Sequence, residues 1–199
     1  DWMNKGGAYE ETAVLYRSNA QSRALEEALL RVSIPYRIYG GLRFYERLEI
    51  KNAIAYLKII FNNKDNPSFE RSISNPTRGV GEKTLGKIRQ AAKKFNISYI
   101  KASAKLIDEG SIGGRGGAGL KDYLEFIIGC KQFIEDNTLS ELMELIIKES
   151  GLYAYHAKEA GEKGKTRTEN LEELITATKN FEQSIKDEKT NVEIAESYL

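Results

Sequence analysis

This sequence has one cysteine, one histidine and no long apolar run. The single Cys130 excludes an internal disulfide and favours a reducing compartment, so we expect a cytoplasmic protein. The single His156 leaves no cluster of histidine and cysteine ligands for zinc, and we expect no metal site. No apolar stretch approaches the roughly 20 residues of a membrane helix, and the N-terminus lacks a signal-peptide pattern, so we expect no membrane partner.

Net charge is also nearly absent, because 30 lysines and arginines meet 29 aspartates and glutamates, which leaves +1. The chain as a whole therefore indicates no partner, and only local clusters of charge can do so. Apolar residues make up 41% of the 199 residues, which is enough for a core in one domain or in two small ones. Asp1 is not a natural start, so we expect the sequence to be a piece of a longer protein.

The first part of the chain predicts a strand, a helix and a second strand. The segment "TAVLYRS" at 12–18 is a short apolar run with β-branched and aromatic residues, which is typical of a buried strand. The segment at 19–33 has apolar residues at helical spacing with Asn19 as its cap, and "IPYRIYG" at 34–40 predicts the second strand. This order is typical of an α/β layer, but it is too short for a whole domain, and we expect residues outside the sequence to complete its sheet.

From Gly41 onward the pattern is helical, so the predicted fold class is mainly α. Apolar residues recur at helical spacing in several segments. A glycine-rich stretch at 110–119 is interpreted as a break between two of them. The expected helices cover residues 49–61, 66–74, 82–96, 98–108, 120–136, 139–151 and 166–185.

One glycine motif has the spelling of a dinucleotide-binding fingerprint. Gly114, Gly116 and Gly119 match the pattern Gly-x-Gly-x-x-Gly. That function needs a strand before the motif and a helix after it, so that the start of the helix can hold the phosphates. No clear strand precedes this motif and no βαβ unit surrounds it, so we interpret it as a flexible loop between helices.

A second motif, "GEKGKT" at 161–166, imitates a phosphate-binding loop. The full pattern needs a glycine where this sequence has Glu159, whose carboxylate would lie where the phosphates have to sit. We therefore interpret the segment as an exposed charged turn. Nothing in the sequence resembles a nucleophile elbow that would pair with His156, and we assign no catalytic residue.

Positive charge gathers between residues 71 and 105, where Glu82 is the only acidic residue. Such clustering is the electrostatic footprint of phosphate binding, although a solvated helix face is the alternative explanation. The basic residues of this segment are Arg71, Arg78, Lys83, Lys87, Arg89, Lys93, Lys94, Lys101 and Lys105.

The segment "RGVGEKT" at 78–84 favours phosphate binding. Two glycines separated by one apolar residue can turn the chain tightly between two helices. The turn leaves backbone N–H groups unpaired at the start of the second helix, where the helix dipole also attracts an anion. The Thr84 hydroxyl adds a donor. This layout predicts a helix–hairpin–helix, which grips the backbone of duplex DNA without reading bases.

Four blocks of this sequence resemble the UvrD-type DNA helicases of superfamily 1, the group that includes PcrA and Rep, and most closely their UvrD branch. The blocks are "AVLYRSNAQSRALEEALL", "PYRIYGGLRFYERLEIKNAIAYLK", "SFERSISNPTRGVGEKTL" and "GEKGKTRTENLEEL". The resemblance implies that residues 1–39 are part of the RecA-like motor domain 2A. It also implies that residues 40–199 are the helical 2B subdomain, which touches the duplex ahead of the fork, and that Gly40 and Gly41 form a hinge between them.

The hairpin and the resemblance together give the candidate site residues. For single-stranded DNA they are Arg17, Asn19 and Arg43, although Arg17 could instead form a surface ion pair. A second backbone contact is assigned to Lys165, Thr166 and Arg167. The candidates for the duplex clamp are Thr77, Arg78, Gly79, Val80, Gly81, Lys83, Thr84, Lys87 and Arg89, with Val80 expected to plug the hairpin into its own core.

The resemblance also implies what lies elsewhere. The Walker A loop and the carboxylates that hold magnesium would precede Asp1, so ATP and Mg²⁺ belong to the full-length parent and none is bound by this piece. We expect the parent to be an ATP-dependent DNA helicase in DNA repair, with a duplex–single-strand junction and DNA repair proteins as partners. The alternatives are a stand-alone helix–hairpin–helix DNA-binding module and a helical protein–protein adaptor with its acidic C-terminal helices as the docking surface.

Overall fold

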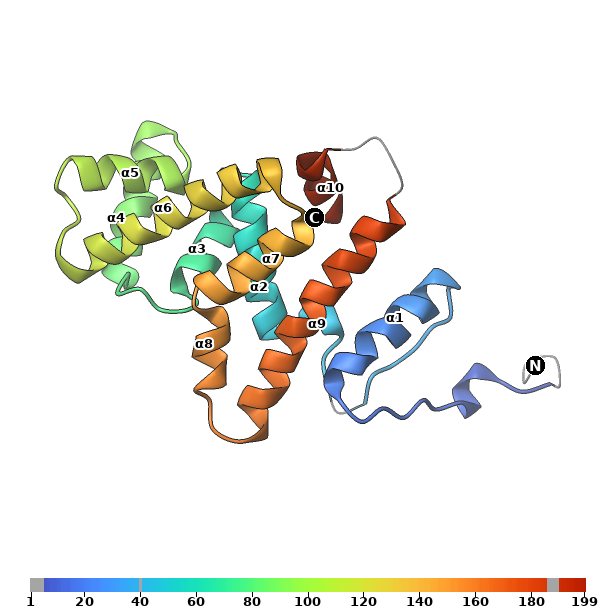
Figure 1. The fold of residues 1–199 in the computed structure, drawn as a ribbon. Helices are drawn as coiled ribbons and strands as arrows, with labels where there is room; N and C mark the ends of the chain where they lie inside the picture. Colours follow the sequence, from blue (N-terminus) through green and yellow to red (C-terminus); the bar gives the residue numbers. More distant parts are fainter. Residues whose placement is uncertain (1–5, 40, 186–189) are drawn as a thin grey trace. The chain divides into compact units, whose positions relative to one another are not determined.

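The structure is a computed structural model, which describes residues 6–39, 41–185 and 190–199. The chain divides into two compact units, Asp1–Phe44 and Tyr45–Leu199. Helices make up most of the second unit and most of the described residues, as Figure 1 shows, and this confirms the mainly α fold class. No described helix is both long enough and apolar enough to cross a membrane.

The first unit is organised around one helix, α1 (Ser22–Arg31), which is preceded by the 3₁₀ turns η2 (Tyr9–Glu11) and η3 (Asn19–Gln21). Glu26 of α1 is buried and accepts hydrogen bonds from the Ser22 hydroxyl at 2.8 Å and the Tyr36 hydroxyl at 3.2 Å. It also accepts the backbone N–H of Phe44 at 3.2 Å. The Glu26 carboxylate thus joins the segment after α1, through Tyr36 and Phe44, to the helix.

The two strands expected at 12–18 and 34–40 are absent among the described residues. The backbone is extended at the edges of the first, with φ −107° and ψ 131° at Thr12 and φ −119° and ψ 140° at Ser18. A strand also needs a neighbour for its N–H and C=O groups, and neither segment pairs with another. Val14 and Leu15 are accordingly 55% and 94% exposed instead of buried, so the predicted strand–helix–strand unit is wrong in its strands.

The second unit is a helical assembly with α2 at its centre, in contact with α3, α6, α7 and α9. Large side chains such as Tyr56, Phe69 and Leu120 are fully buried in its core, and each contributes about 2 kcal/mol. The helices are α2 (Leu48–Phe61), α3 (Asn66–Ser74), α4 (Glu82–Phe95), α5 (Tyr99–Asp108), α6 (Gly114–Asp136), α7 (Leu139–Glu149), α8 (Leu152–Ala157), α9 (Glu162–Ser184) and α10 (Asn191–Tyr198), with the 3₁₀ turn η4 (Phe44–Glu46) before them.

Side-chain caps fix several of these helix starts. Asp65 accepts the N–H of Ser68 at 3.0 Å and begins α3. Ser98 caps α5, and Thr138 forms a capping box with Glu141 at the start of α7. At the other end of α4, Asn96 adopts the left-handed conformation, with φ 51°, and stops the helix. These local signals explain why a helix is found at each position expected between residues 49 and 151, although α6 begins at Gly114 instead of residue 120 and α7 ends at Glu149.

Two glycine-rich segments are helical where loops were expected. The motif with Gly114, Gly116 and Gly119 is the first part of α6, so the flexible-loop interpretation is wrong. The "GEKGKT" segment likewise forms the first turns of α9 from Glu162 onward. A Cβ on Gly164 would lie 2.4 Å from the Glu159 carbonyl oxygen, so the start of α9 packs backbone to backbone, and glycine permits this contact. Tertiary contact outweighs the weak helix propensity of glycine.

Candidate nucleic-acid interface

The turn between α3 and α4 has the geometry that its glycines predict. Gly79 has φ +74°, which favours glycine over any other residue. Gly81 is the N-cap of α4, and its carbonyl oxygen accepts the N–H groups of Thr84 at 2.9 Å and Leu85 at 3.0 Å. Gly81 itself has φ −92°, a value open to all residues. A Cβ on Gly81 would meet no atom within 4 Å, so the chain faces open space there.

The start of α4 presents backbone N–H groups to that open space. Within the part of the chain that the structure describes, the amides of Glu82 and Lys83 have no hydrogen-bond partner. These are the first two helical positions, where the positive end of the helix dipole is concentrated. The Lys83 side chain is exposed beside them, and Thr84 is half-buried. The corner can therefore receive an anion, although the carboxylate of Glu82 opposes it.

Arg78 is used inside the protein. Its guanidinium donates to the carbonyl oxygens of Pro76 at 2.9 Å and Ser150 at 2.8 Å, and it lies 5.5 Å and 5.6 Å from the ring centres of Tyr56 and Tyr123. Burial raises the pKa of the Tyr56 hydroxyl above its usual range, against the opposing effect of Arg78. Arg78 thus fixes the turn to the core by satisfying carbonyl groups that would otherwise lack donors.

Arg89 is also paired within the protein. Its Nε and Nη2 atoms lie 2.6 Å and 2.8 Å from the two carboxylate oxygens of Glu70, and Nη1 contacts Glu82. The hydrogen bond from Arg89 holds the pKa of Glu70 below its usual value. Because Glu70 is on α3 and Arg89 on α4, this two-point pair braces the helices on either side of the turn.

The other predicted duplex residues are more accessible. Thr77, Lys83 and Lys87 are exposed, and Lys87 donates to the Ser111 carbonyl oxygen at 2.8 Å. Val80 is half-buried, so the structure leaves it partly at the surface of the turn. The nine predicted residues lie along the α3–α4 turn and the first half of α4. Among these nine described residues, the cation whose side chain has no partner is Lys83, and the two arginines pair within the protein.

The basic residues near the end of α4 form a separate group. Phe95 is 43% exposed, and the Nζ atoms of Lys94 and Lys105 lie 5.2 Å and 4.6 Å from its ring centre. Lys105 also forms an ion pair with Glu109 at 2.7 Å. This group of two lysines around one aromatic ring is a solvated face, as the alternative explanation for the basic segment supposes.

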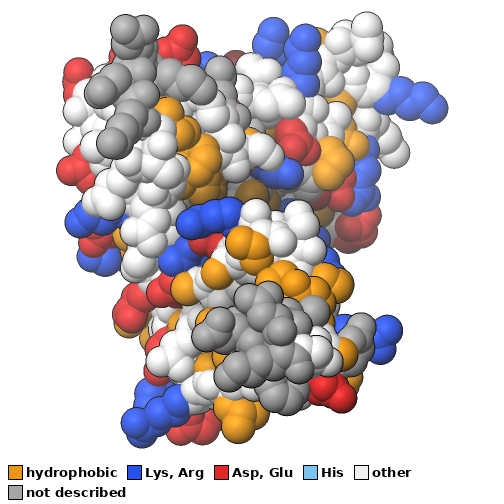
Figure 2. All heavy atoms as spheres, turned by 90° about the vertical axis from the view of Figure 1, so that its right-hand side faces the viewer, with side chains coloured by type: hydrophobic (Ala, Val, Ile, Leu, Met, Phe, Trp, Pro, Cys, Tyr) orange, Lys and Arg blue, Asp and Glu red, His pale blue; other side chains and the backbone are white. Residues whose placement is uncertain are grey.

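The predicted single-strand and hinge residues lie in the first unit. Arg17 is exposed, and its backbone N–H donates to Gln21 Oε1 at 3.0 Å. Asn19 begins η3, and the Arg43 guanidinium lies 5.4 Å from the ring centre of Tyr36. Gly41 is exposed, whereas Gly40 lies outside the described residues. Apolar side chains also reach the surface in this unit, among them Leu15, Leu30 and Tyr39, and Figure 2 shows apolar side chains on the face it views.

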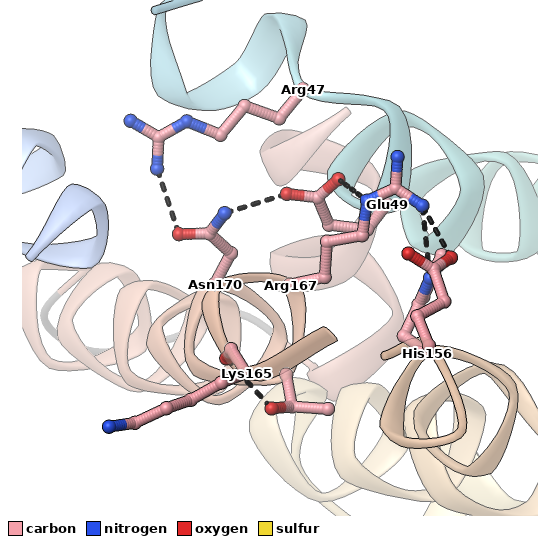
Figure 3. A network of polar contacts seen from close by, with 8 residues as sticks. Arg47, Glu49, His156, Lys165, Arg167 and Asn170 are labelled. Carbon is pink, nitrogen blue, oxygen red and sulfur yellow. Dashed lines mark hydrogen bonds and ion pairs between the residues drawn. The ribbon is translucent and has the colours of Figure 1, made fainter. Parts of the chain in front are cut away.

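The residues of the second predicted contact, 165–167, point in different directions, as Figure 3 shows for Lys165 and Arg167. Arg167 points into a polar network, where its Nη1 lies 2.5 Å from Glu159 Oε1 and its Nε lies 3.7 Å from Glu49 Oε2. Lys165 points away from the network, and Thr166 is half-buried. Arg167 therefore holds α9 against α2 and against the segment that follows α8, and of these three residues only Lys165 offers a charge to solvent.

The network continues on both sides of Arg167. Asn170 donates to Glu49 Oε1 at 2.6 Å and accepts from Arg47 Nη1 at 2.9 Å. His156 Nδ1 lies 3.0 Å from Glu159 Oε1. Burial opposes ionisation of Glu159, but the hydrogen bond from His156 and the charge of Arg167 outweigh it and hold the pKa of this carboxyl below its usual value. The sole histidine is thus a buried structural residue.

One residue of this corner was missed by the sequence reasoning. Arg115 lies in the second position of α6 and is exposed beside the α3–α4 turn. A Cβ on Gly79 would be 3.0 Å from Arg115 Cγ, which shows how closely the arginine side chain lies over the turn. The residue was hidden because its glycine-rich surroundings indicated a loop. A signal for it was the single charge within that glycine run.

The chain matches known proteins along most of its length. Residues 1–110 match the model of the UvrD-like helicase C-terminal domain. The chain is 48% identical over 187 residues to DNA helicase II of Escherichia coli K12, which is 94% of this chain and 26% of that protein. It is 46% identical to DNA helicase II of Salmonella typhimurium LT2, with the same coverage.

A more distant relative carries a related name. The chain is 38% identical over 181 residues to the ATP-dependent DNA helicase PcrA of Leuconostoc citreum, which is 91% of this chain and 24% of that protein. The chain spans about a quarter of the length of the curated relatives it matches.

Proposed function

Because the chain belongs to the UvrD-like helicase C-terminal domain family, we propose that it is part of an ATP-dependent DNA helicase and holds the backbone of duplex DNA at a junction with single-stranded DNA. The observation that carries this proposal is the corner before α4. Unpaired amides of Glu82 and Lys83, the open space at Gly81 and the free Lys83 ammonium group all meet there. A backbone phosphate matches this set of donors.

The grip acts on the duplex without regard to its sequence. Amides at a helix start are fixed in place, so they lose little entropy when a phosphate binds. They reach only phosphate oxygens, which every base pair presents alike. The internal pairing of Arg78 and Arg89 supports the turn, so that these donors keep their positions. Held in this way, the duplex would stay aligned while a motor draws one strand away from it.

The ATP site is assigned to other parts of the parent. The residues of this chain do not fit the nucleotide, because "GEKGKT" begins a helix whose Gly164 backbone is pressed against Glu159. Lys165, the counterpart of a phosphate-binding lysine, points away from that contact. Among the described residues, no group of three His, Cys, Asp or Glu side chains could hold a metal ion. We propose that ATP and Mg²⁺ bind to other parts of the parent helicase.

The remaining assignments concern the rest of the parent. We assign residues 1–39 to motor domain 2A, with Arg17, Asn19 and Arg43 facing single-stranded DNA, and residues 40–199 to subdomain 2B. The glycines at 40 and 41 would let the two parts rotate. We also assign the parent to DNA repair in the cytoplasm, with repair proteins as its partners.

A substitution at Gly81 tests the duplex contact. Gly81→Val places a branched side chain in the open space where the phosphate approaches, at a φ that valine adopts without strain. We expect anisotropy measurements with a labelled duplex–single-strand junction to show about tenfold weaker binding at about 50 mM salt. Gly86→Val is the matched control, because it adds the same side chain to the same helix where no atom lies within 4 Å.

The outcome separates this proposal from its alternatives. Helical circular dichroism must be preserved in both variants. Equal affinity of a folded Gly81→Val protein and the Gly86→Val control would contradict the contact. An adaptor would not lose affinity for DNA steeply as salt rises, whereas a backbone clamp must. Loss confined to one DNA sequence would also contradict the clamp, since it cannot read bases.

A further inference from the structure

The start of α6 docks directly on the turn between α3 and α4. A Cβ on Gly119 would lie 1.9 Å from the Arg78 carbonyl oxygen, and one on Gly116 would lie 3.1 Å from the Gly79 carbonyl oxygen. The Gly116 position is also 3.5 Å from Thr84 Oγ1. No larger residue fits at position 119, so the two glycines allow the helix backbone to meet the turn. The first residues of α6 therefore stand at a fixed place beside the candidate phosphate site.

Arg115 uses this closeness to lie across the turn. From the Cβ position of Gly79, its Cγ is 3.0 Å, its Cδ 3.4 Å and its Nε 3.5 Å away. The side chain is exposed, and within the described residues its guanidinium has neither a hydrogen bond nor an ion pair. Arg78 and Arg89, by contrast, are both paired internally. The contact with the turn at Gly79 orders the aliphatic part of the Arg115 side chain, while its guanidinium stays available to bind an anion.

A shallow pocket lies between the turn and α6. Its chemistry is mixed: a hydroxyl group and two guanidinium groups favour an anion, and one carboxylate opposes it. Arg78 contributes its field although its hydrogen bonds are taken, and Asp122 forms no ion pair with Arg115 among the described residues. The lining residues are Thr77, Arg78, Arg115, Ala118, Gly119 and Asp122.

We propose that Arg115 and Thr77 bind a second phosphate of the duplex backbone, next to the one held at the start of α4. This inference rests on the function proposed above and adds α6 to the contact surface. A planar guanidinium suits the oxygens of a phosphodiester, and a hydroxyl group adds a directional donor. Two phosphates held by two helices fix the direction of the duplex, which one phosphate cannot do. Asp122 limits the affinity and so favours release.

Substitutions on one helix test the contact. Arg115→Ala should weaken binding of a labelled duplex–single-strand junction about fivefold at about 50 mM salt and lower the slope of log K against log salt by about one. Lys121→Ala is the matched control, since it removes the same charge from the exposed face of α6 outside the pocket, and it should change binding less than twofold, or about 0.3 log units. Asp122→Asn should tighten binding by removing the opposing charge.

A direct signal complements the affinities. The Nε–H resonance of Arg115, assigned by its loss in Arg115→Lys, should shift when an unlabelled short duplex is added to the ¹⁵N-labelled chain. The absence of any shift would overturn the inference, and so would equal losses in Arg115→Ala and Lys121→Ala. If Gly81→Val weakens binding and Arg115→Ala does not, the inference fails alone. If neither weakens binding, the proposed function fails with it.

Discussion

The segments "GVGEKT" at the start of α4 and "GEKGKT" at the start of α9 share two glycines, a glutamate, a lysine and a threonine, and each opens a long helix. Before α4, the cap residue Gly81 faces open space and the first amides are free. In the first turn of α9, Gly164 is pressed against the carbonyl oxygens of Glu159 and His156. The same residue types therefore build an open corner in one place and a closed joint in the other.

The two sites also differ in how many of their basic side chains pair with other groups of the protein. At the closed joint, Arg167 meets Glu159 and Glu49, which come from two other segments of the chain. At the open corner, Arg78, Lys87 and Arg89 have close partners, while Lys83 and Arg115 face solvent. A basic residue in a motif is thus a candidate for DNA binding only when no acid or carbonyl group of the fold has already taken it.

Breaking the closed joint should have the largest effect. Arg167→Ala leaves the buried carboxylate of Glu49 and the half-buried carboxylate of Glu159 without their cation. Removing one partner of such a network costs about 3 kcal/mol in the free energy of unfolding. Urea unfolding followed by circular dichroism measures it. Lys165→Ala, two residues away and pointing outward, should change the same quantity by less than about 0.5 kcal/mol. Equal effects would show that Arg167 is not the centre of the joint.

Separating α6 from the open corner should have the next largest effect. Gly119→Ala puts a methyl group 1.9 Å from the Arg78 carbonyl oxygen, so the helix and the turn must move apart. Such overpacking destabilises by about 2 kcal/mol. The control Gly129→Ala, on the same helix with no atom within 4 Å of the added methyl group, should instead stabilise by up to about 1 kcal/mol. A stable Gly119→Ala protein would contradict the docking of α6 on the turn.

The pair of Arg89 with Glu70 should contribute less, because both side chains are about one-third exposed and water screens them. The folded protein holds the pKa of Glu70 below its usual value. The pair therefore stabilises the folded state fully at pH values above the usual pKa, and this contribution is lost as the pH falls through the lowered pKa of the folded state. Glu70→Gln should therefore lower the free energy of unfolding at about pH 7 by a fraction of the Arg167→Ala loss, and this difference should shrink as the pH falls through the lowered pKa of Glu70. A loss that grows as the pH falls would have the wrong sign.

The smallest effect concerns ATP. The closed geometry of the "GEKGKT" segment predicts that the 199-residue chain hydrolyses no ATP, with or without single-stranded DNA. Phosphate release assays on the chain and on Lys165→Ala should both stay at the background rate. DNA-stimulated hydrolysis that Lys165→Ala abolishes would mean that the two glycine corners are more alike than the structure indicates.

The sequence predicted the turn and the helix start of the candidate site but not which of its side chains pair within the protein. Local signals predicted a tight turn at Gly79 and Gly81 and a helix from Glu82. The structure shows both at these residues. The two strands near the N-terminus were predicted from residue type alone, and they do not form because a strand needs hydrogen bonds from a neighbour. The start of α6 was interpreted as a loop because glycine normally weakens a helix.

The sequence by itself determined the helix positions between residues 49 and 151 apart from the start of α6, the tight turn before α4 and the family of the chain, because these depend on periodicity, caps and motifs that neighbouring residues carry. The tertiary structure alone decided which cations are free. Arg78 reaches Ser150 and Arg167 reaches Glu49, partners 72 and 118 positions away by residue number. Pairing across such separations depends on how helices meet, and the same contacts leave Arg115 beside the turn without a partner.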